Sequence, residues 1–260
     1  MKTPRGFFLL VALLLSTAAQ AKAQEAVPDS GTFSPSLRFE GLFYLNYETG
    51  EAGGTDYSRF NVHRGYLTAR AQILPKLSGR ITLDTNQDRE GDVTGDMQVR
   101  LKYIYAKYDF GDWGKLTGVG LEGGIVHMVW LDFEEHVNLY RMRDQMFMER
   151  SGMFNSADLG LTLTGGIGED LPDDYQDEVS SHYASRWGSF AVGIYNGGGY
   201  HAVEENEDKV AQGRLTLRPL PDVVPGLQVS GLAILGKGNR GGDPEEIPDW
   251  HAYNVMGSYQ

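Results

Sequence analysis

The sequence predicts an all-β fold, an antiparallel up-and-down β-barrel whose strands cross a membrane. First, apolar and polar residues alternate with a period of two along most of the chain after residue 35, as in strands that lie between two different environments. Second, short connectors with Pro or Gly alternate with longer acidic connectors, as in outer-membrane barrels. Third, aromatic residues gather near the ends of the predicted strands, where interfacial girdles are expected.

A soluble, exported β-sandwich is the alternative fold, because its strands would alternate in the same way. A sandwich gives no reason for the rhythm of short and long connectors, and only a closed barrel satisfies every backbone group of a sheet in lipid. These two arguments favour the barrel.

The N-terminus has the features of an export signal. Lys2 and Arg5 precede an apolar run at 7–15, and Ala21-Lys22-Ala23 has the small-x-small form of a cleavage site. We interpret residues 1–23 as a secretory signal peptide. Residues 24–35 are then expected to form a short periplasmic segment that precedes a barrel at 36–260. The expected location is the outer membrane of a Gram-negative-type cell envelope, with membrane lipid and lipopolysaccharide as partners.

Composition excludes several other classes of protein. The 260 residues include no Cys, so a disulfide-stapled scaffold is excluded. The formal charge is −12, and removal of residues 1–23 leaves 20 basic against 35 acidic residues, or −15. A chain this acidic lacks the basic surface of a nucleic-acid-binding protein. We therefore expect no nucleic-acid partner.

Ten segments of the chain have strand character. In the first, Leu37, Phe39, Phe43 and Leu45 alternate with mostly polar neighbours. Each strand is expected to be about ten residues long, which suits a tilted membrane crossing. The predicted strands are 37–47, 66–73, 79–84, 97–106, 119–126, 159–164, 190–195, 213–218, 227–236 and one that starts near residue 251. In the fourth of these, the alternation places Tyr103 and Tyr105 on the apolar face.

The connectors between these strands fall into two kinds. Short ones contain Pro or Gly and lie at 74–76, 111–114 and 219–226, whereas long acidic ones lie at 48–58, 85–96, 198–209 and 237–250. The aromatic residues near strand ends include Tyr47, Tyr108, Phe110 and Trp113.

If the apolar positions face lipid, the alternate positions line the interior of the barrel. Eight basic residues against four acidic ones (Glu40, Asp84, Glu122 and Asp158) would then occupy the wall. Rings of Arg and Lys favour anions in a wet pore, but the same arginines can instead pair with carboxylates and rigidify the wall. The predicted pore-lining residues are Arg38, Arg64, Arg70, Arg80, Arg100, Lys102, Glu122, Arg214 and Arg218.

The segment 128–155 is the one long stretch without alternation. Leu131, Glu135 and Leu139 have helical spacing. We expect this third loop to contain a short helix, to fold inward and to narrow the channel, although a loop packed outside on its neighbours remains an alternative. The loop residues expected to meet a solute are Asp132, Glu134, Glu135, Arg141, Arg143, Glu149 and Arg150.

Motifs for catalysis and metal binding are weak. Residues 84–92 only partly match a calcium loop, and His127 and His136 have no ligand partner at a useful spacing in the sequence. The pattern G-x-S-x-G is missing around Ser189. We therefore expect no catalytic residues, no metal and no cofactor.

Three stretches resemble a known family. They are FEEHVNLYRMRDQMFMERSGMFNSADLGLTLTG, SRFNVHRGYLTARAQILPKLSGRITLD and FAVGIYNGGGY. Together they resemble the phosphate-selective porin O and P family over most of residues 36–236. The resemblance implies a sixteen-stranded, trimeric outer-membrane porin with an inward constriction loop.

The sequence departs from this family in two respects. It offers about ten strands and ends in Gln260 rather than in an aromatic residue, so we expect a C-terminally incomplete chain. The loop also holds more acidic than basic residues, unlike the dense basic ladder of the family's anion specialists.

The expected function is diffusion of small hydrophilic solutes across an outer membrane, with a weak preference for phosphate-like anions as an open question. Two alternatives are a barrel hydrolase, for which Ser181 and His182 would be the residues to test, and a soluble binding module. Of these, the porin, which is not an enzyme, agrees best with the two-faced strands.

Overall fold

The computed structural model describes residues 33–88, 95–138, 140–142, 145–243 and 246–260. Outside the described residues lie the predicted signal peptide at 1–23, most of the segment 24–35, and the loop residue Arg143.

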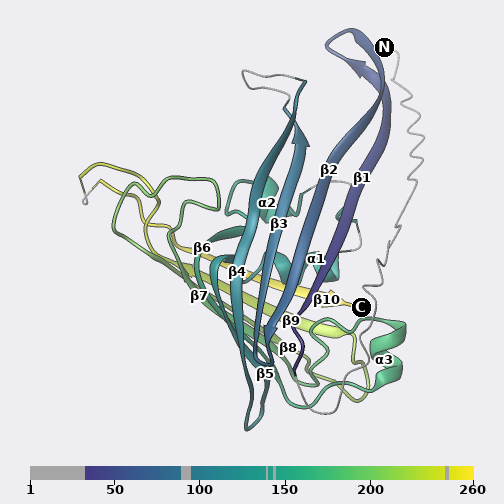
Figure 1. The fold of residues 1–260 in the computed structure, drawn as a ribbon, viewed down its shortest axis with the longest axis vertical. Helices are drawn as coiled ribbons and strands as arrows, with labels where there is room; N and C mark the ends of the chain where they lie inside the picture. Colours follow the sequence, from purple (N-terminus) through teal and green to yellow (C-terminus); the bar gives the residue numbers. More distant parts are fainter. Residues whose placement is uncertain (1–32, 89–94, 139, 143–144, 244–245) are drawn as a thin grey trace. The chain divides into compact units, whose positions relative to one another are not determined.

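The fold is all-β with few helices. Ten strands form one antiparallel up-and-down sheet in the order β1 to β10 (Figure 1). The prediction of ten strands in this order is confirmed. The strands are β1 Ser36–Ala52, β2 Thr55–Leu74, β3 Leu77–Gln87, β4 Met97–Trp113, β5 Leu116–His127, β6 Ala157–Ile167, β7 Gly188–Tyr195, β8 Val210–Leu217, β9 Leu227–Leu235 and β10 Ala252–Tyr259. The helices are α1 Leu131–Val137, α2 Phe147–Arg150 and α3 Asp173–Glu178.

The chain divides into two compact units. Unit 1 comprises residues up to 71 together with 81–102, and unit 2 comprises 72–80 together with 103–260. Both units have a sheet with an exposed apolar face. In unit 1, Leu67 is 48% exposed whereas its neighbour Thr68 is 7% exposed and hydrogen-bonds to Thr82 at 2.9 Å between hydroxyl oxygens. Period-two alternation thus separates apolar and polar side chains as the sequence predicts.

The first connector differs from the expectation of a long acidic loop at 48–58. Strand β1 continues to Ala52 and strand β2 begins at Thr55, so only Gly53 and Gly54 form the turn. Both glycines have positive φ, 59° and 82°. Tight hairpin turns use positive φ at both central residues, which Gly adopts without strain. The Gly-Gly pair therefore sets the length of this connector, and the flanking acidic residues belong to the strands.

In unit 2 the sheet from β6 to β10 has continuous registers, with these strands side by side (Figure 1), whereas the β5–β6 pairing has one register shift between Thr117 and Gly120. Leu161 and Leu215 are 48% and 47% exposed, whereas the adjacent Thr162 and Thr216 are 1% and 0% exposed. The face that carries these threonines is called the polar face below.

The segment between β5 and β6 packs on this polar face. Its helix α1 begins at Leu131, as the helical spacing predicts. Apolar side chains of the segment form a buried cluster with residues of β7, β8 and β9. The members of the cluster from the segment are Met128, Val129, Trp130, Leu131, Met146, Met148 and Phe154, and those from the three strands are Ala191, Tyr195, Val210, Leu232 and Ile234.

The facing of β4 in unit 2 corrects the sequence prediction. Tyr103 is only 6% exposed, whereas Ile104 is 43% exposed. The rings of Tyr103 and Tyr105 pack against His127, with centroids 4.3 and 5.4 Å from its ring. The assignment of these two tyrosines to the apolar face was therefore wrong. Lys102 and Tyr103 are consecutive buried residues, so the alternation shifts by one position here.

A long connector at 168–187 was not anticipated. It contains α3 and joins the end of β6 to the start of β7, where Ile167 pairs with Gly188. The segment with α1 lies at the other end of β6, where Ala157 pairs with His127. Short turns alone were expected at this end of the strands.

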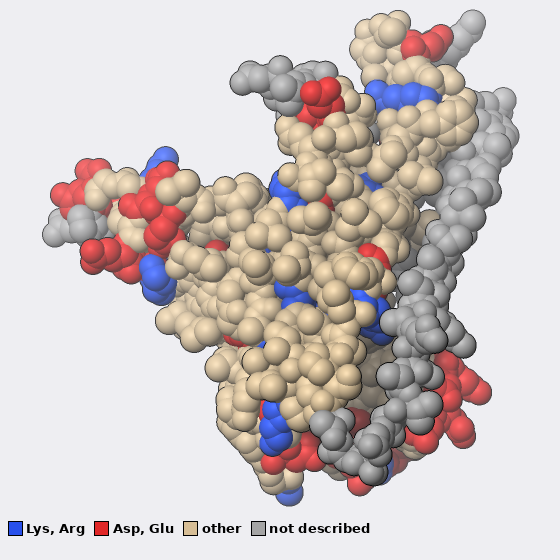
Figure 2. Space-filling view, viewed as in Figure 1, with Lys and Arg blue, Asp and Glu red and all other residues tan. Residues whose placement is uncertain are grey.

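The acidic connectors at 198–209 and 237–250 lie together at the other end of unit 2. Asn239 joins them, since its side chain donates to the Val203 carbonyl at 2.7 Å and accepts from the Glu205 amide at 2.8 Å. Figure 2 shows acidic side chains gathered at this end of the unit.

Candidate functional site

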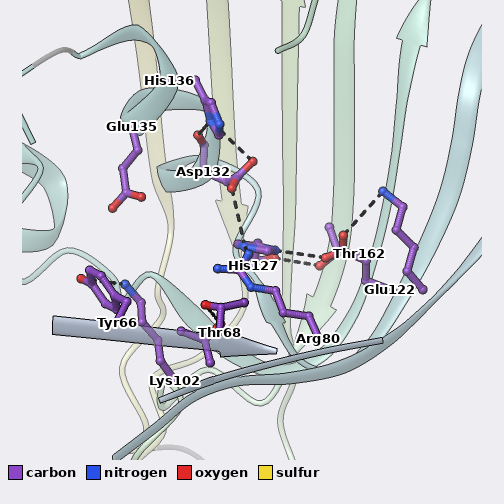
Figure 3. Close-up of polar contacts among 12 residues, drawn as sticks. Tyr66, Thr68, Arg80, Lys102, Glu122, His127, Asp132, Glu135, His136 and Thr162 are labelled. Atoms are coloured by element: carbon purple, nitrogen blue, oxygen red, sulfur yellow. Dashed lines mark hydrogen bonds and ion pairs between the residues drawn. The ribbon is translucent and has the colours of Figure 1, made fainter. Parts of the chain in front are cut away.

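A charged cluster lies on the polar face of unit 2, next to helix α1 (Figure 3). It consists of Arg80 of β3, Glu122 and His127 of β5, and Asp132 and His136 of α1, and is called the Asp132 cluster below. Strand β5 ends at His127 and the chain passes through three buried residues into α1. This short passage brings the carboxylate of Asp132 next to the imidazole of His127.

His127 is at the centre of the cluster. Arg80 Nη1 lies 3.0 Å from His127 Nε2, and Glu122 Oε2 lies 3.2 Å from Nδ1. A guanidinium group can only donate, so in the neutral ring Nε2 accepts from Arg80 and Nδ1 donates to Glu122. Nε2 also lies 3.6 Å from Asp132 Oδ1, which makes the protonated ring an ion-pair partner of Asp132.

Glu122 and His127 are five positions apart, a spacing that a regular strand would place on opposite faces. Gly124 lies between them with a φ of 131°, and a Cβ at this position would lie 2.3 Å from the Ile104 carbonyl oxygen. Only glycine adopts this conformation so close to a neighbouring strand. His127 is the last residue of β5, where the chain leaves the sheet toward α1, so its side chain can reach the same charged cluster as Glu122.

Asp132 is stabilised as a carboxylate. Burial alone would raise the pKa of Asp132, but positive charge on His127 and His136, the Tyr183 hydroxyl and Arg80 together hold that pKa below its ordinary value. Tyr183 donates its hydroxyl to Asp132 Oδ2. Burial, followed by the charge of Asp132, keeps the pKa of Tyr183 well above its ordinary value.

Helix α1 is held on the sheet by Arg214 of β8. Its Nε donates to the Val129 carbonyl at 2.9 Å, and its Nη1 donates to Ser189 and Thr216 hydroxyls at 3.0 and 2.7 Å. The guanidinium carbon lies 4.5 Å from the ring centre of Phe133 and 5.0 Å from that of Tyr183.

Arg218, which follows the last residue of β8, has a similar role. Its Nη2 donates to the Tyr183 carbonyl at 3.0 Å, and its Nη1 donates to the Pro225 carbonyl. Arg214 and Arg218 are 2% and 1% exposed. Of the predicted pore-lining residues, these two are enclosed by the protein and bind the segment at 128–137 and the connector at 168–187.

The predicted pore-lining residues of unit 1 are mostly paired with carboxylates. Asp84, which is fully buried, accepts from Arg64 at 3.2 Å and from Arg100 at 3.0 Å. Glu40 pairs with both Arg38 and Arg70. The ammonium of Lys102 lies 4.7 Å from the centre of the Tyr66 ring.

In unit 2, Lys107 lies next to the Asp132 cluster. Its ammonium lies 3.7 Å from Glu122 Oε1, and its side chain is 38% exposed. Glu122 therefore sits between Lys107 and His127.

The other predicted constriction-loop residues among the described ones make contacts within their own segment or lie on α2. Glu134 accepts from the Trp130 indole at 3.0 Å, and burial raises its pKa. Glu135 accepts from Arg141 at 2.8 Å. Glu149 and Arg150 lie on α2, apart from the Asp132 cluster.

Sequence reasoning did not find Tyr183 and considered His127 and His136 only as metal ligands. One signal was present for His136, since Asp132 and His136 have the i, i+4 spacing of neighbours on a helix. Their closest side-chain approach is 3.9 Å. Tyr183 had no signal, because its contact with Asp132 spans 51 residues.

Chemically, the arrangement offers charge compensation and hydrogen bonding on a sheet face. Within the part of the chain that the structure describes, no group of three or more His, Asp and Glu residues could hold a metal ion. Among the described residues, no helix has the length and apolar character to cross a membrane. Comparisons with protein-family models, with curated proteins and with solved structures find no match to this chain.

Proposed function

We propose that the chain is part of an outer-membrane porin that lets small hydrophilic solutes diffuse across the membrane. In this proposal the sheet belongs to a closed barrel, the polar face lines a water-filled passage, and the segment 128–155 lies inside as the constriction loop. The resemblance to the phosphate-selective porin O and P family supports the same architecture and adds sixteen strands and a trimer.

One observation carries the proposal: large apolar side chains are exposed next to fully buried hydroxyls along the same strands. Ile81 is 45% exposed beside Thr82 at 1%, and Val229 is 47% exposed beside Ser230 at 0%. Exposing so many large apolar groups to water is unfavourable and marks an interaction surface. Contact with hydrocarbon removes this cost, and strands of a membrane barrel alternate in this way.

The charges on the polar face support a passage for small hydrophilic solutes with little preference for charge. Most basic residues of the face already have acidic, carbonyl or hydroxyl partners, as Arg100 and Arg214 illustrate. Such compensation reduces the field that a permeating ion meets. A weak preference for anions would depend on the partly exposed Lys107 and on Arg80, next to Glu122 and Asp132.

The first test is conductance in planar lipid bilayers with the full-length chain. We expect stepwise single-channel currents and a reversal potential near zero in a salt gradient. Absence of current steps from a folded, membrane-inserted protein would contradict the pore.

The second test is the environment of neighbouring side chains. Spin labels at Leu67, Ile81 and Leu161 should be quenched by lipid-soluble oxygen, and labels at Thr68, Thr82 and Thr162 by a water-soluble quencher. Equal behaviour of the two sets would remove the basis of the proposal, and release of the protein by high salt or carbonate would instead favour a soluble fold.

A further inference from the structure

A second feature of unit 2 lies beyond Tyr183 from the Asp132 cluster, at the end of β5, β6 and β7 where the connector 168–187 folds back. The base of this connector continues the β6–β7 hairpin, since the Leu171 amide donates to the Ala184 carbonyl at 2.8 Å. Thr117 of β5 fastens it by donating its hydroxyl to the Gly168 carbonyl at 2.9 Å. Between the connector and the strand ends is a cavity of about 850 Å³.

The volume of this cavity lies in the range of small-molecule sites, which is roughly 300–1,000 Å³. A glycine in its wall lets the connector approach the strand ends closely. A Cβ at Gly166 would lie 1.9 Å from the Ser185 hydroxyl and 2.6 Å from that of Thr117. The space therefore suits a molecule larger than an inorganic ion.

The lining is rich in groups that exchange hydrogen bonds. Thr164, Ser181 and Ser185 bring hydroxyl groups that can both donate and accept. Phe190 and Tyr183 add two aromatic rings. A purely apolar molecule would leave these hydroxyls without their hydrogen bonds to water, which is costly.

The charged groups of the lining indicate which charge the occupant can carry. Asp112, Glu169 and Asp170 contribute three carboxylates against the single ammonium of Lys115. Ionised carboxylates only accept hydrogen bonds. Asp112 and Asp170 already accept from the Gly118 amide and the Ser185 hydroxyl, so their remaining lone pairs favour an occupant that donates. An anion such as phosphate would meet three like charges in the lining. A neutral molecule with many hydroxyl groups satisfies both conditions.

We propose that this cavity binds a neutral polyhydroxylated solute with the size of one or two sugar rings. The proposal names a solute class for the porin and rests on that proposed function for its physiological meaning, whereas binding itself does not depend on it. Tyr183 lines the cavity and also donates to Asp132. The occupant therefore lies next to the residue that fastens helix α1.

The test is titration of the full-length chain, refolded in detergent, with sucrose by isothermal calorimetry. We expect a Kd on the order of 1 mM. Ser181→Trp places a large ring in the cavity from an exposed position and should remove measurable binding. Val179→Trp adds the same ring to the same connector at a residue outside the lining and should leave the Kd unchanged. Thr164→Val keeps the shape, removes one hydroxyl and should weaken binding by about fivefold.

Three results would overturn the proposal: no heat of binding from sucrose with folded protein, equal Kd for the wild type and Ser181→Trp, or displacement of sucrose by inorganic phosphate or calcium ions. Planar-bilayer conductance is recorded on the same preparation. Sucrose binding without current steps would refute the pore and keep the site, whereas current steps without sucrose binding would refute the site and keep the pore.

Discussion

Arginine has different partners on the polar faces of the two units. In unit 1, Arg64 and Arg100 converge on the buried carboxylate of Asp84. In unit 2, Arg214 is more buried than either of these arginines. Its contacts are nevertheless a backbone carbonyl, two hydroxyls and two aromatic rings. The first arrangement neutralises charge within the wall of the sheet. The second uses a cation to attach a separate segment of chain to that wall.

The difference teaches that a basic residue on the polar face of a strand is no measure of the charge that this face exposes. Arg38 is largely exposed, with 72% of its side chain accessible, whereas Arg214 is enclosed. The four predictions below test whether the two arrangements differ in energy as they do in geometry, from the largest expected effect to the smallest.

Arg214→Met should have the largest effect. The change removes the donor to the Val129 carbonyl and to the Ser189 and Thr216 hydroxyls, and it removes the cation from the rings of Phe133 and Tyr183. We expect a loss of about 2–4 kcal/mol in the free energy of unfolding, measured by urea titration with tryptophan fluorescence. The control Arg38→Met should change it by less than about 0.5 kcal/mol. Equal losses for both variants would contradict the comparison.

Asp84→Asn should be next. The variant removes the negative charge that Arg64 and Arg100 share, and buried cations without a counter-charge are destabilising. Because these two arginines remain partly exposed, we expect a loss of about 2 kcal/mol in the same titration. Glu40→Gln serves as the control at a more exposed pair, with a loss of at most about 0.5 kcal/mol. A neutral result for Asp84→Asn would show that the buried cluster contributes nothing to stability.

Tyr183→Phe should cost less, because it removes one hydrogen bond and keeps the ring on Arg214. We expect a loss of about 1–2 kcal/mol and, if the porin proposal holds, larger fluctuations of the open-channel current as α1 becomes less firmly held. The exposed Tyr253 offers a matched control in Tyr253→Phe, which should leave both measurements unchanged. Identical current noise in all three proteins would show that α1 does not depend on this bond.

The smallest effect concerns acid sensitivity. The pKa of Asp132 is lower in the folded protein than its ordinary value, so its stabilisation is present above the unfolded pKa of about 3.9 and is lost as pH falls through the lower folded pKa. The free energy of unfolding of the wild type should therefore fall below about pH 4, and Asp132→Asn should show a shallower fall. A steeper fall in the variant would reverse the assigned sign.

The sequence was sufficient to predict the ten strands and the start of α1, because both follow from short-range periodicity at residues such as Leu161, Thr162 and Leu131. It was insufficient where contacts between distant residues decide. The shift of facing at Tyr103 follows from packing against His127, and the anchoring role of Arg214 follows from a carbonyl on another element. The connector with α3 was missed because its acidic residues show neither strand nor helix periodicity strongly.

The anchoring of α1 also has a consequence for the order of folding. Val129 and its donor Arg214 are 85 positions apart, and Asp132 and its donor Tyr183 are 51 apart. Contacts between such distant positions form late, because the intervening chain must first be ordered. The six strands up to β6 can thus pair while the segment before β6 is still detached. That segment settles only after β7 and β8 have joined the sheet, which makes its docking a late step in the maturation of the protein.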